Sequence, residues 1–136
     1  MAERQAEIKA TLQRLADAFN RADFEGALEI AHPDIEFIRS WEKESLRGHE
    51  ALAAWMKPDA FENQHLELRD LTVDGDKVLV LQHLHARGAG SGIDVDVDSW
   101  AVWTLNPDGL GTRLEIFLHH QETEAREAAG LPRQRG

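Results

Sequence analysis

The spacing of apolar residues changes along the chain, from helical spacing in the N-terminal part to alternation in the C-terminal part. Ile8, Leu12, Leu15 and Phe19 recur three or four residues apart, which predicts an amphipathic helix over residues 3–21. In the second half of the chain apolar and polar residues mostly alternate, as in strands with one buried face. We therefore expect an α+β protein in which a few helices pack against a sheet.

Capping and breaking residues divide the region between the first helix and the sheet. Asp23 is suited to cap a short helix, and His32-Pro33-Asp34 ends that helix because proline disfavours helical geometry in the residue before it. Residues 42–47 are expected to form a polar loop. The elements predicted here are a helix over 24–31, a strand over 35–41 and a helix that begins at Gly48 and is closed by Pro58.

A long antiparallel meander is predicted over the C-terminal half. A strand over 65–73 leads into the tight turn Asp74-Gly75-Asp76, and three strand-like runs follow. Those runs are KVLVLQHLHAR, GIDVDVDSWAVWTL and TRLEIFLHH, joined by GAGSG and NPDGLG. A last helix over 122–129 is expected to stop at Gly130. Such a sheet can curl around the helices and leave a blind pocket between them.

Composition restricts the classes of function. The chain has 136 residues, which suits one domain, and no cysteine, so disulfides, thiolate nucleophiles and cysteine-type zinc sites are excluded. Its formal net charge of −10 disfavours nucleic acid and anionic membranes as partners, because both bind basic surfaces. The N-terminal sequence MAERQAEIKA is charged and has no apolar run, so we expect no signal peptide, no membrane span and a cytoplasmic protein.

The order and spacing of five segments resemble those of a known family. The segments are LADAFNRADFEGALEIAHPDIEF, RGHEAL, the DGD turn, GSGIDVDVDSWAVWTL and EAREAAGL. With them the chain resembles the SnoaL-like family of the nuclear transport factor 2-like superfamily. The resemblance implies one cone-shaped α+β domain over residues 1–131, with three N-terminal helices on a curved antiparallel sheet, a short C-terminal helix and a tail over 132–136. It also implies a pocket open at one end and a homodimer. It implies no particular reaction, because this fold hosts many functions.

Two distant relatives in that superfamily have well-defined catalytic groups, and the chain lacks both sets. In a match to ketosteroid isomerase, Leu15, Arg39 and Ala101 stand in place of a tyrosine, an aspartate base and an aspartic acid. Arginine stays protonated, so steroid isomerisation by that mechanism is not expected. In a match to limonene-type epoxide hydrolase, glutamine and leucine replace the Asp–Arg–Asp set. The positions concerned are Gln82, Leu84 and Leu118.

Charged residues alternate along two successive strands. Asp94, Asp96 and Asp98 share one face of their strand, and three unpaired carboxylates would be costly to bury, so we expect this face in solvent. The basic partners expected across the hairpin are His83, His85 and Arg87. An H-x-H pair on a strand can instead bind zinc with a third ligand, for which His119 is the candidate. That residue would lie roughly 10 Å away, two strands off, so we expect no metal.

The orientation of the 77–87 strand is left open by its sequence, because apolar residues occupy both faces. We favour the register that places basic side chains opposite acidic ones. It directs toward the pocket Val78, Val80, Gln82 and Leu84. A slip of one residue would bring in Leu79, Leu81, His83 and His85 instead. In the favoured register the outer face is partly apolar, which suggests a homodimer through that face. Its apolar residues are Leu79, Leu81, Trp100, Val102 and Phe117.

Arg39 and His120 are the candidate catalytic residues. Arg39 could hold a carboxylate or enolate oxygen. Alternation along the last strand places His120 on the inner face near the pocket end, and histidine titrates near neutral pH. The alternative is an arginine paired with an acid near the mouth and a histidine that only ends a strand. The residues predicted to line the pocket are Phe19, Phe37, Trp41, Trp55, Gln82, Ser99, Ala101, Trp103, Ile116 and Leu118.

Two hypotheses of function follow. The first is a cofactor-independent isomerase, cyclase or hydrolase for a polycyclic or terpenoid-like molecule, with His120 as general acid/base and Arg39 as anion stabiliser. The second is a non-catalytic small-molecule-binding or structural dimer domain, which the missing carboxylates favour. Neither hypothesis requires a metal or another cofactor. A polar pair with perturbed titration inside the pocket would favour the enzyme.

Overall fold

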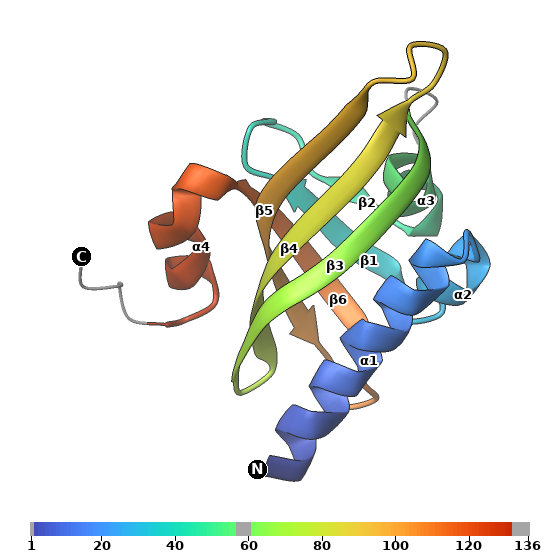
Figure 1. The fold of residues 1–136 in the computed structure, drawn as a ribbon. Coiled ribbons are helices and arrows are strands. Elements are labelled where there is room, and N and C mark those ends of the chain that lie inside the picture. Colours follow the sequence, from blue (N-terminus) through green and yellow to red (C-terminus); the bar gives the residue numbers. More distant parts are fainter. Residues whose placement is uncertain (1, 57–60, 132–136) are drawn as a thin grey trace.

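The computed structural model describes residues 2–56 and 61–131 (Figure 1). Its helices are α1 (Ala2–Asn20), α2 (Phe24–Leu28), α3 (His49–Met56) and α4 (Glu122–Ala128), and a 3-10 turn, η1 (His119–Gln121), precedes α4. The expected end of α3 at Pro58 and the predicted tail over 132–136 lie outside the described residues. Within the described part, no helix combines the length and the apolar character needed to cross a bilayer.

Six strands form one curved sheet in the order β2-β1-β6-β5-β4-β3. They are β1 (Ala31–Arg39), β2 (Leu46–Arg47), β3 (Phe61–Asp74), β4 (Lys77–Gly88), β5 (Asp94–Leu105) and β6 (Gly111–Leu118). Figure 1 shows the long β3–β5 arm in front and β1, β2 and β6 behind it, with α1 beside β3 and α4 at the opposite side. The predicted α+β fold with helices on a curved sheet is confirmed.

One strand pairing differs from the predicted antiparallel sheet. β1 and β6 run parallel, with Phe37 opposite Leu114, whereas the other neighbouring strands pair antiparallel. Parallel neighbours cannot be joined by a tight turn and need a long connection. Here that connection holds α3 and most of the sheet. The pairing joins segments far apart in the sequence, so local alternation gave no sign of it.

The predicted boundary between the second helix and the first strand is wrong. Asp23 does cap α2, accepting a hydrogen bond from the Gly26 N–H at 3.0 Å, but the helix ends at Leu28. The carbonyl of Ile30 accepts a hydrogen bond from the Gly111 N–H at 2.8 Å. Ile30 is therefore bonded to the start of β6, where a last helical turn was expected. Pro33 lies inside β1, at the place where its pairing with β6 shifts, and a proline is tolerated there because no ladder hydrogen bond is needed.

The main core lies between α1 and the inner face of the sheet. The apolar stripe of α1 supplies Ile8, Leu12 and Leu15, which belong to one buried cluster with Phe37 of β1 and Val80 of β4. These helix positions are those predicted from their spacing. Packing of this stripe is what holds the helix across the curved sheet, because burial of an apolar face supplies most of a helix's stability in a protein.

A second buried cluster lies on the outer face of the sheet, under α4. Its members are Leu79, Trp100, Val102, Ala125 and Ala129, with Leu81 and Phe117 packed against them. The indole N–H of Trp100 donates to the carbonyl of His119 at 3.0 Å, which ties the chain reversal to β5. The chain's own helix therefore covers much of the apolar outer face, so this face gives less reason to expect a partner than the sequence did. The homodimer stays a prediction.

Gly111 should not tolerate a larger residue, because an added Cβ would lie 2.7 Å from two ring atoms of Trp103. Trp103 is a buried core residue that is only 5% exposed. We expect Gly111→Ala to lower the free energy of unfolding by about 1–3 kcal/mol, as overpacking does. Urea denaturation measures this change.

A glycine of the β3–β4 turn provides the control. Gly75 has φ +63° and nothing within 4 Å of an added Cβ. Asparagine tolerates that backbone conformation, so Gly75→Asn should change stability by less than about 0.5 kcal/mol. Equal stability of the Gly111→Ala variant and the unaltered protein would show that Trp103 can shift without cost.

Candidate functional site

A cavity of about 240 Å³ opens between the inner face of the sheet, α1 and α3. Its wall is made mainly of aliphatic and aromatic side chains. The residues that line it are Leu12, Leu15, Phe19, Trp41, Trp55, Met56, Phe61, Gln64, Leu66, Leu68, Val80, Gln82, Leu84, Val97, Asp98, Ser99, Trp103, Leu114, Ile116 and Leu118. Its volume lies slightly below the ~300 Å³ at which typical ligand pockets begin, so it suits a small molecule.

The pairing of β4 with β5 determines which side chains reach the cavity. Val80 pairs with Ala101, Gln82 with Ser99 and Leu84 with Val97, and side chains two apart point to one face. Val80, Gln82 and Leu84 accordingly line the cavity, as the favoured register predicted.

Exposure rises along the strands and defines a blind end and a mouth. On β5, Trp103 is 5% exposed and Val97 is 46% exposed. On β6, Leu114 is 2% exposed and Leu118 is 40% exposed. Trp41, which also lines the cavity, is 46% exposed and so belongs to the mouth as well. An apolar molecule entering here would bury its body toward Trp103 and Leu114.

Few polar side chains interrupt this wall. Gln82 Nε2 donates to Ser99 Oγ at 3.2 Å, and Gln64 Nε2 donates to the carbonyl of Met56 at 2.9 Å. Among the described residues, Asp98 is the one ionisable member of the lining, and its carboxylate is hydrogen-bonded to His83 and paired with Arg69. The cavity therefore presents neutral hydrogen-bonding groups to a ligand.

Most of the residues predicted to line the pocket do line the cavity. They are Phe19, Trp41, Trp55, Gln82, Ser99, Trp103, Ile116 and Leu118. Phe37 and Ala101 are fully buried behind that wall. The Phe37 ring makes an edge-on contact with Trp55, with centroids 4.9 Å apart, so it supports the wall without belonging to it.

The sequence missed the contribution of β3 and of the first helix to the wall. Leu12 and Leu15 were predicted only as part of the apolar stripe of the first helix, and Gln64, Leu66 and Leu68 were not among the residues predicted to line the pocket. The alternation of Gln64, Leu66 and Leu68 with polar residues was a usable signal that one face of β3 points inward.

The candidate catalytic pair does not come together in the cavity. β6 ends at Leu118, and His120 lies exposed in η1, so its predicted place on the inner face is wrong. The strand stops two residues before His120, so the alternation of inward and outward side chains does not reach it. Arg39 also does not line the cavity. Its guanidinium carbon lies 5.9 Å from the Phe37 ring centroid, and its Nε is buried without a hydrogen-bond partner among the described residues. Their catalytic roles stay predictions.

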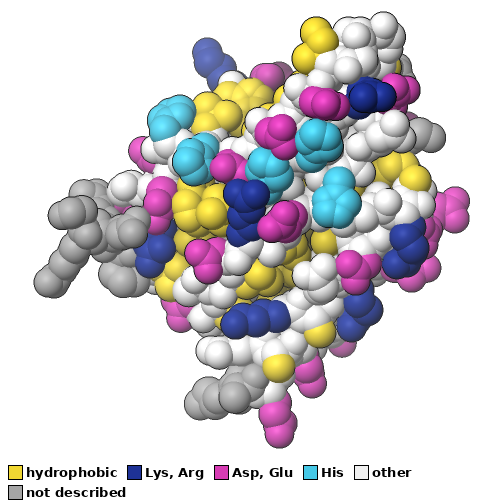
Figure 2. All heavy atoms as spheres, in the orientation of Figure 1, with side chains coloured by type: hydrophobic (Ala, Val, Ile, Leu, Met, Phe, Trp, Pro, Cys, Tyr) yellow, Lys and Arg dark blue, Asp and Glu magenta, His cyan; other side chains and the backbone are white. Residues whose placement is uncertain are grey.

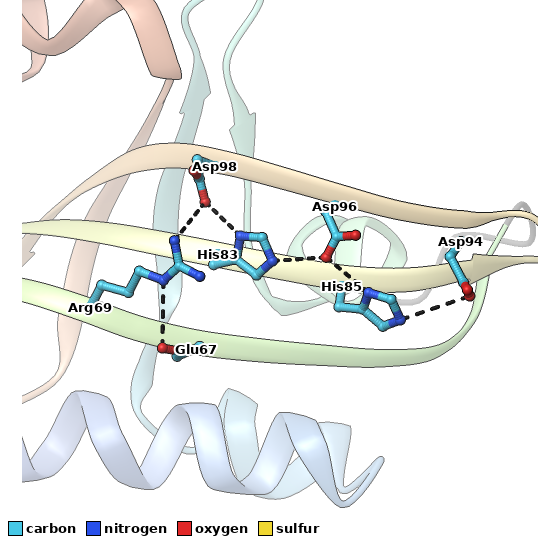
Figure 3. A network of polar contacts seen from close by, with 7 residues as sticks. All are labelled: Glu67, Arg69, His83, His85, Asp94, Asp96 and Asp98. Atoms are coloured by element: carbon cyan, nitrogen blue, oxygen red, sulfur yellow. Dashed lines mark hydrogen bonds and ion pairs between the residues drawn. The ribbon is translucent and has the colours of Figure 1, made fainter.

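The outer face of the β3–β5 arm carries a ladder of charged side chains, hereafter the outer ladder. Its residues are Glu67, Arg69, His83, His85, Arg87, Asp94, Asp96 and Asp98. Figure 2 shows histidine and acidic side chains gathered on this face, and Figure 3 shows most of the ladder's members in a row across the three strands. The predicted cross-strand pairing is confirmed. In the described part of the chain, no three histidine or acidic side chains are arranged to hold a metal ion.

His83 lies at the centre of the outer ladder. Its Nδ1 lies 2.6 Å from Asp98 Oδ1 and its Nε2 lies 2.9 Å from Asp96 Oδ1. Ionised carboxylates only accept, so both ring nitrogens donate and His83 is an imidazolium in this arrangement. Hydrogen bonds to Asp98 and then to Asp96 raise the pKa of His83. In return, the pKa of Asp96 is lowered by hydrogen bonds from His85 and His83, and that of Asp98 by the one from His83.

The chain belongs to the SnoaL-like domain family, whose model matches residues 12–114. Curated proteins include no match to the chain. Solved structures with this fold include a protein from Jannaschia sp. CCS1 that is described as a SnoaL-like polyketide cyclase. It is 23% identical to the chain, with a TM-score of 0.72 over 93% of this chain and 94% of that one.

Two further structures resemble the chain at 17% identity. SalBIII, an epoxide hydrolase/cyclase-like enzyme in pyran ring formation in polyether salinomycin, matches with a TM-score of 0.75 over 90% of this chain and 97% of that one. Rv0760c from Mycobacterium tuberculosis, in complex with estradiol-17β-hemisuccinate, matches with a TM-score of 0.71 over 85% and 95%. At these identities the likeness establishes the fold alone.

His83 should titrate above the ordinary histidine value of about 6.5, because its charged form is bonded to two carboxylates. NMR titration of the imidazole signals, assigned with His83→Gln, measures this pKa. Asp98→Asn should lower it more than Asp96→Asn, since the bond to Asp98 is its largest cause. A His83 pKa at or below 6.5, or the reverse order of the two variants, would contradict this account.

The same bonds make the stability contribution of His83 depend on pH. A raised histidine pKa stabilises the fold below about pH 6.5 and loses its effect as pH rises through the folded-state pKa. Lowered carboxylate pKa values stabilise it above about pH 3.9 and lose their effect in more acidic solution. The difference in melting temperature between the unaltered protein and His83→Gln should therefore be greatest between these values.

Proposed function

We propose that the protein binds a small, mainly apolar molecule in the cavity. The observation that carries the proposal is the composition of the wall, in which aliphatic and aromatic side chains surround the neutral groups of Gln64, Gln82 and Ser99. Pockets lined in this way bury most of a ligand's surface and orient it with a few polar contacts. The estradiol-17β-hemisuccinate complex of Rv0760c, a neighbour in fold, supports this use of the fold.

Binding without reaction fits the lining better than acid/base catalysis does. A general acid or base must reach the reacting atom within hydrogen-bond distance. Among the described residues of the wall, the single ionisable side chain is Asp98, and its carboxylate is bonded to His83 and paired with Arg69. A homodimer and a cytoplasmic location complete the proposal, and no cofactor is part of it.

Ligand entry can be tested by filling the cavity with a side chain from the protein itself. Leu84 lines the cavity near its mouth, so Leu84→Trp should occupy ligand space and weaken binding at least about 10-fold, the effect of roughly 1.4 kcal/mol. The probe is fluorene, a tricyclic hydrocarbon. Its binding is read from quenching of tryptophan fluorescence, because Trp41, Trp55 and Trp103 line the cavity.

The neighbouring residue on the same strand provides the matched control. His85 points to the outer face, where it contacts Asp96, so His85→Trp adds the same indole on the other side of the sheet. That variant should bind fluorene as the unaltered protein does. If quenching did not saturate as fluorene was added, or if Leu84→Trp and His85→Trp weakened fluorene binding equally, the cavity would be ruled out as the binding site.

A cofactor-independent enzyme is the second candidate, and the cyclase and epoxide hydrolase/cyclase-like neighbours in fold favour it. Here Arg39 and His120 keep the roles of anion stabiliser and general acid/base. Incubation with polycyclic epoxides and ketones, followed by mass spectrometry, would detect turnover. If His120 is the acid/base group, His120→Ala should lower turnover about 10²–10⁴-fold. Full turnover by that variant would remove the assignment, with exposed His119→Ala as the control.

A further inference from the structure

The one direct side-chain contact between polar groups of the cavity wall joins Gln82 and Ser99, among the described residues. Gln82 Nε2 donates to Ser99 Oγ at 3.2 Å, and the two residues are direct cross-strand partners on β4 and β5. Both side chains are half-buried and line the cavity. We refer to them as the Gln82–Ser99 pair.

The Gln82–Ser99 pair has two hydrogen-bond donors for which no described residue provides an acceptor. A glutamine amide has two N–H donors and a serine hydroxyl has one O–H donor. One amide hydrogen is used on Ser99, and the hydroxyl hydrogen of Ser99 and the second amide hydrogen of Gln82 have no acceptor among the described residues. A carbonyl oxygen has two lone pairs and could accept both hydrogens.

The pair lies between the blind end and the mouth. On β5, Ser99 stands between buried Ala101 and exposed Val97, and on β4, Gln82 stands between buried Val80 and Leu84 near the mouth. Neighbours two residues away along a strand are ~7 Å apart. A ligand that fills the apolar end would therefore present a polar atom to the pair only if that atom lies near the middle of its skeleton.

The lining also selects against charge on the ligand. No cationic side chain lines the cavity among the described residues, and Arg39 lies outside that lining. The one anionic group, Asp98, is turned to the outer ladder. A carboxylate brought into this wall would lose its hydration without gaining a counter-ion, which is costly.

From these observations we propose that the Gln82–Ser99 pair determines specificity by binding a carbonyl oxygen on a neutral, mainly apolar ligand. This inference rests on the proposed function, since it assumes that the cavity binds an apolar body. To the proposed function it adds the chemical class of the ligand and the two residues that bind its carbonyl oxygen. The pair positions the ligand and is given no part in a reaction.

Three compounds with one skeleton test the inference: fluorene, 9-fluorenone and fluorene-9-carboxylate. The measurement is the dissociation constant of each, from tryptophan quenching or calorimetry. The unaltered protein should bind fluorenone about 10-fold more tightly than fluorene, as expected for one or two net hydrogen bonds. It should bind the carboxylate more weakly than either.

Ser99→Ala and Gln82→Leu should each reduce the preference for fluorenone over fluorene to less than about 3-fold. Fluorene binding itself should change little, because the apolar wall is intact. The preference is the ratio of the dissociation constants of fluorene and fluorenone in the same variant, so a change that affects both ligands equally does not alter it. Ser45→Ala, in an exposed loop, is the matched serine control and should keep the preference. Gln64→Leu is the comparison variant within the wall, because the Gln64 amide also lines the cavity but is bonded to the backbone of Met56.

The outcomes separate the two proposals. If none of the three compounds binds the unaltered protein, the proposed function fails. If fluorene binds but fluorenone binds no better, or if Ser99→Ala keeps the preference, the carbonyl site fails and the apolar binding function stands. Loss of the preference in Gln64→Leu alone would move the carbonyl site to Gln64 and overturn the assignment. Carboxylate binding as tight as that of fluorenone would contradict a neutral ligand.

Discussion

The uninterrupted pairing of β4 with β5 is the constraint on which both faces of the protein depend. The register runs from Lys77 opposite Thr104 to Arg87 opposite Asp94 without a shift. Side chains alternate between the faces of a strand, so this one register decides every inward and outward position along both strands. It puts the apolar residues and the Gln82–Ser99 pair in the cavity wall, and it puts the histidines opposite the aspartates on the outer face.

A slip by one residue would be unfavourable on both sides at once. It would turn His83 and His85 into the apolar cavity and leave the three aspartates of β5 without these partners. Charged groups without partners are costly to bury, and like charges along one strand repel each other. The outer ladder therefore contributes to the shape of the cavity even though its side chains point away from it. Its ion pairs are exposed, so their effect lies more in selecting the register than in adding stability.

Much of the fold and part of the site could be predicted from the sequence, because the relevant patterns are local. The helical stripe from Ile8 to Phe19, the cap at Asp23 and the charge pattern along β4 and β5 each lie within one or two elements. The failures involve contacts between distant segments. The parallel pairing of β1 with β6, the capture of Ile30 by Gly111 and the cover that α4 gives to Trp100 depend on tertiary structure. His120 was misplaced because alternation does not show where a strand stops.

The separation of charge from the cavity bears on what kind of function the protein can have. Ionisable groups with perturbed pKa values often gather at catalytic sites. Here the groups with shifted pKa values, His83, Asp96 and Asp98, interact with one another on the outer face. Ser99 is adjacent to Asp98 in sequence but points to the opposite face, and its hydroxyl is bonded to a neutral amide. The register that pairs the charges on the outer face thus leaves the described part of the cavity wall with apolar surface and the neutral hydrogen-bonding groups of Gln82 and Ser99.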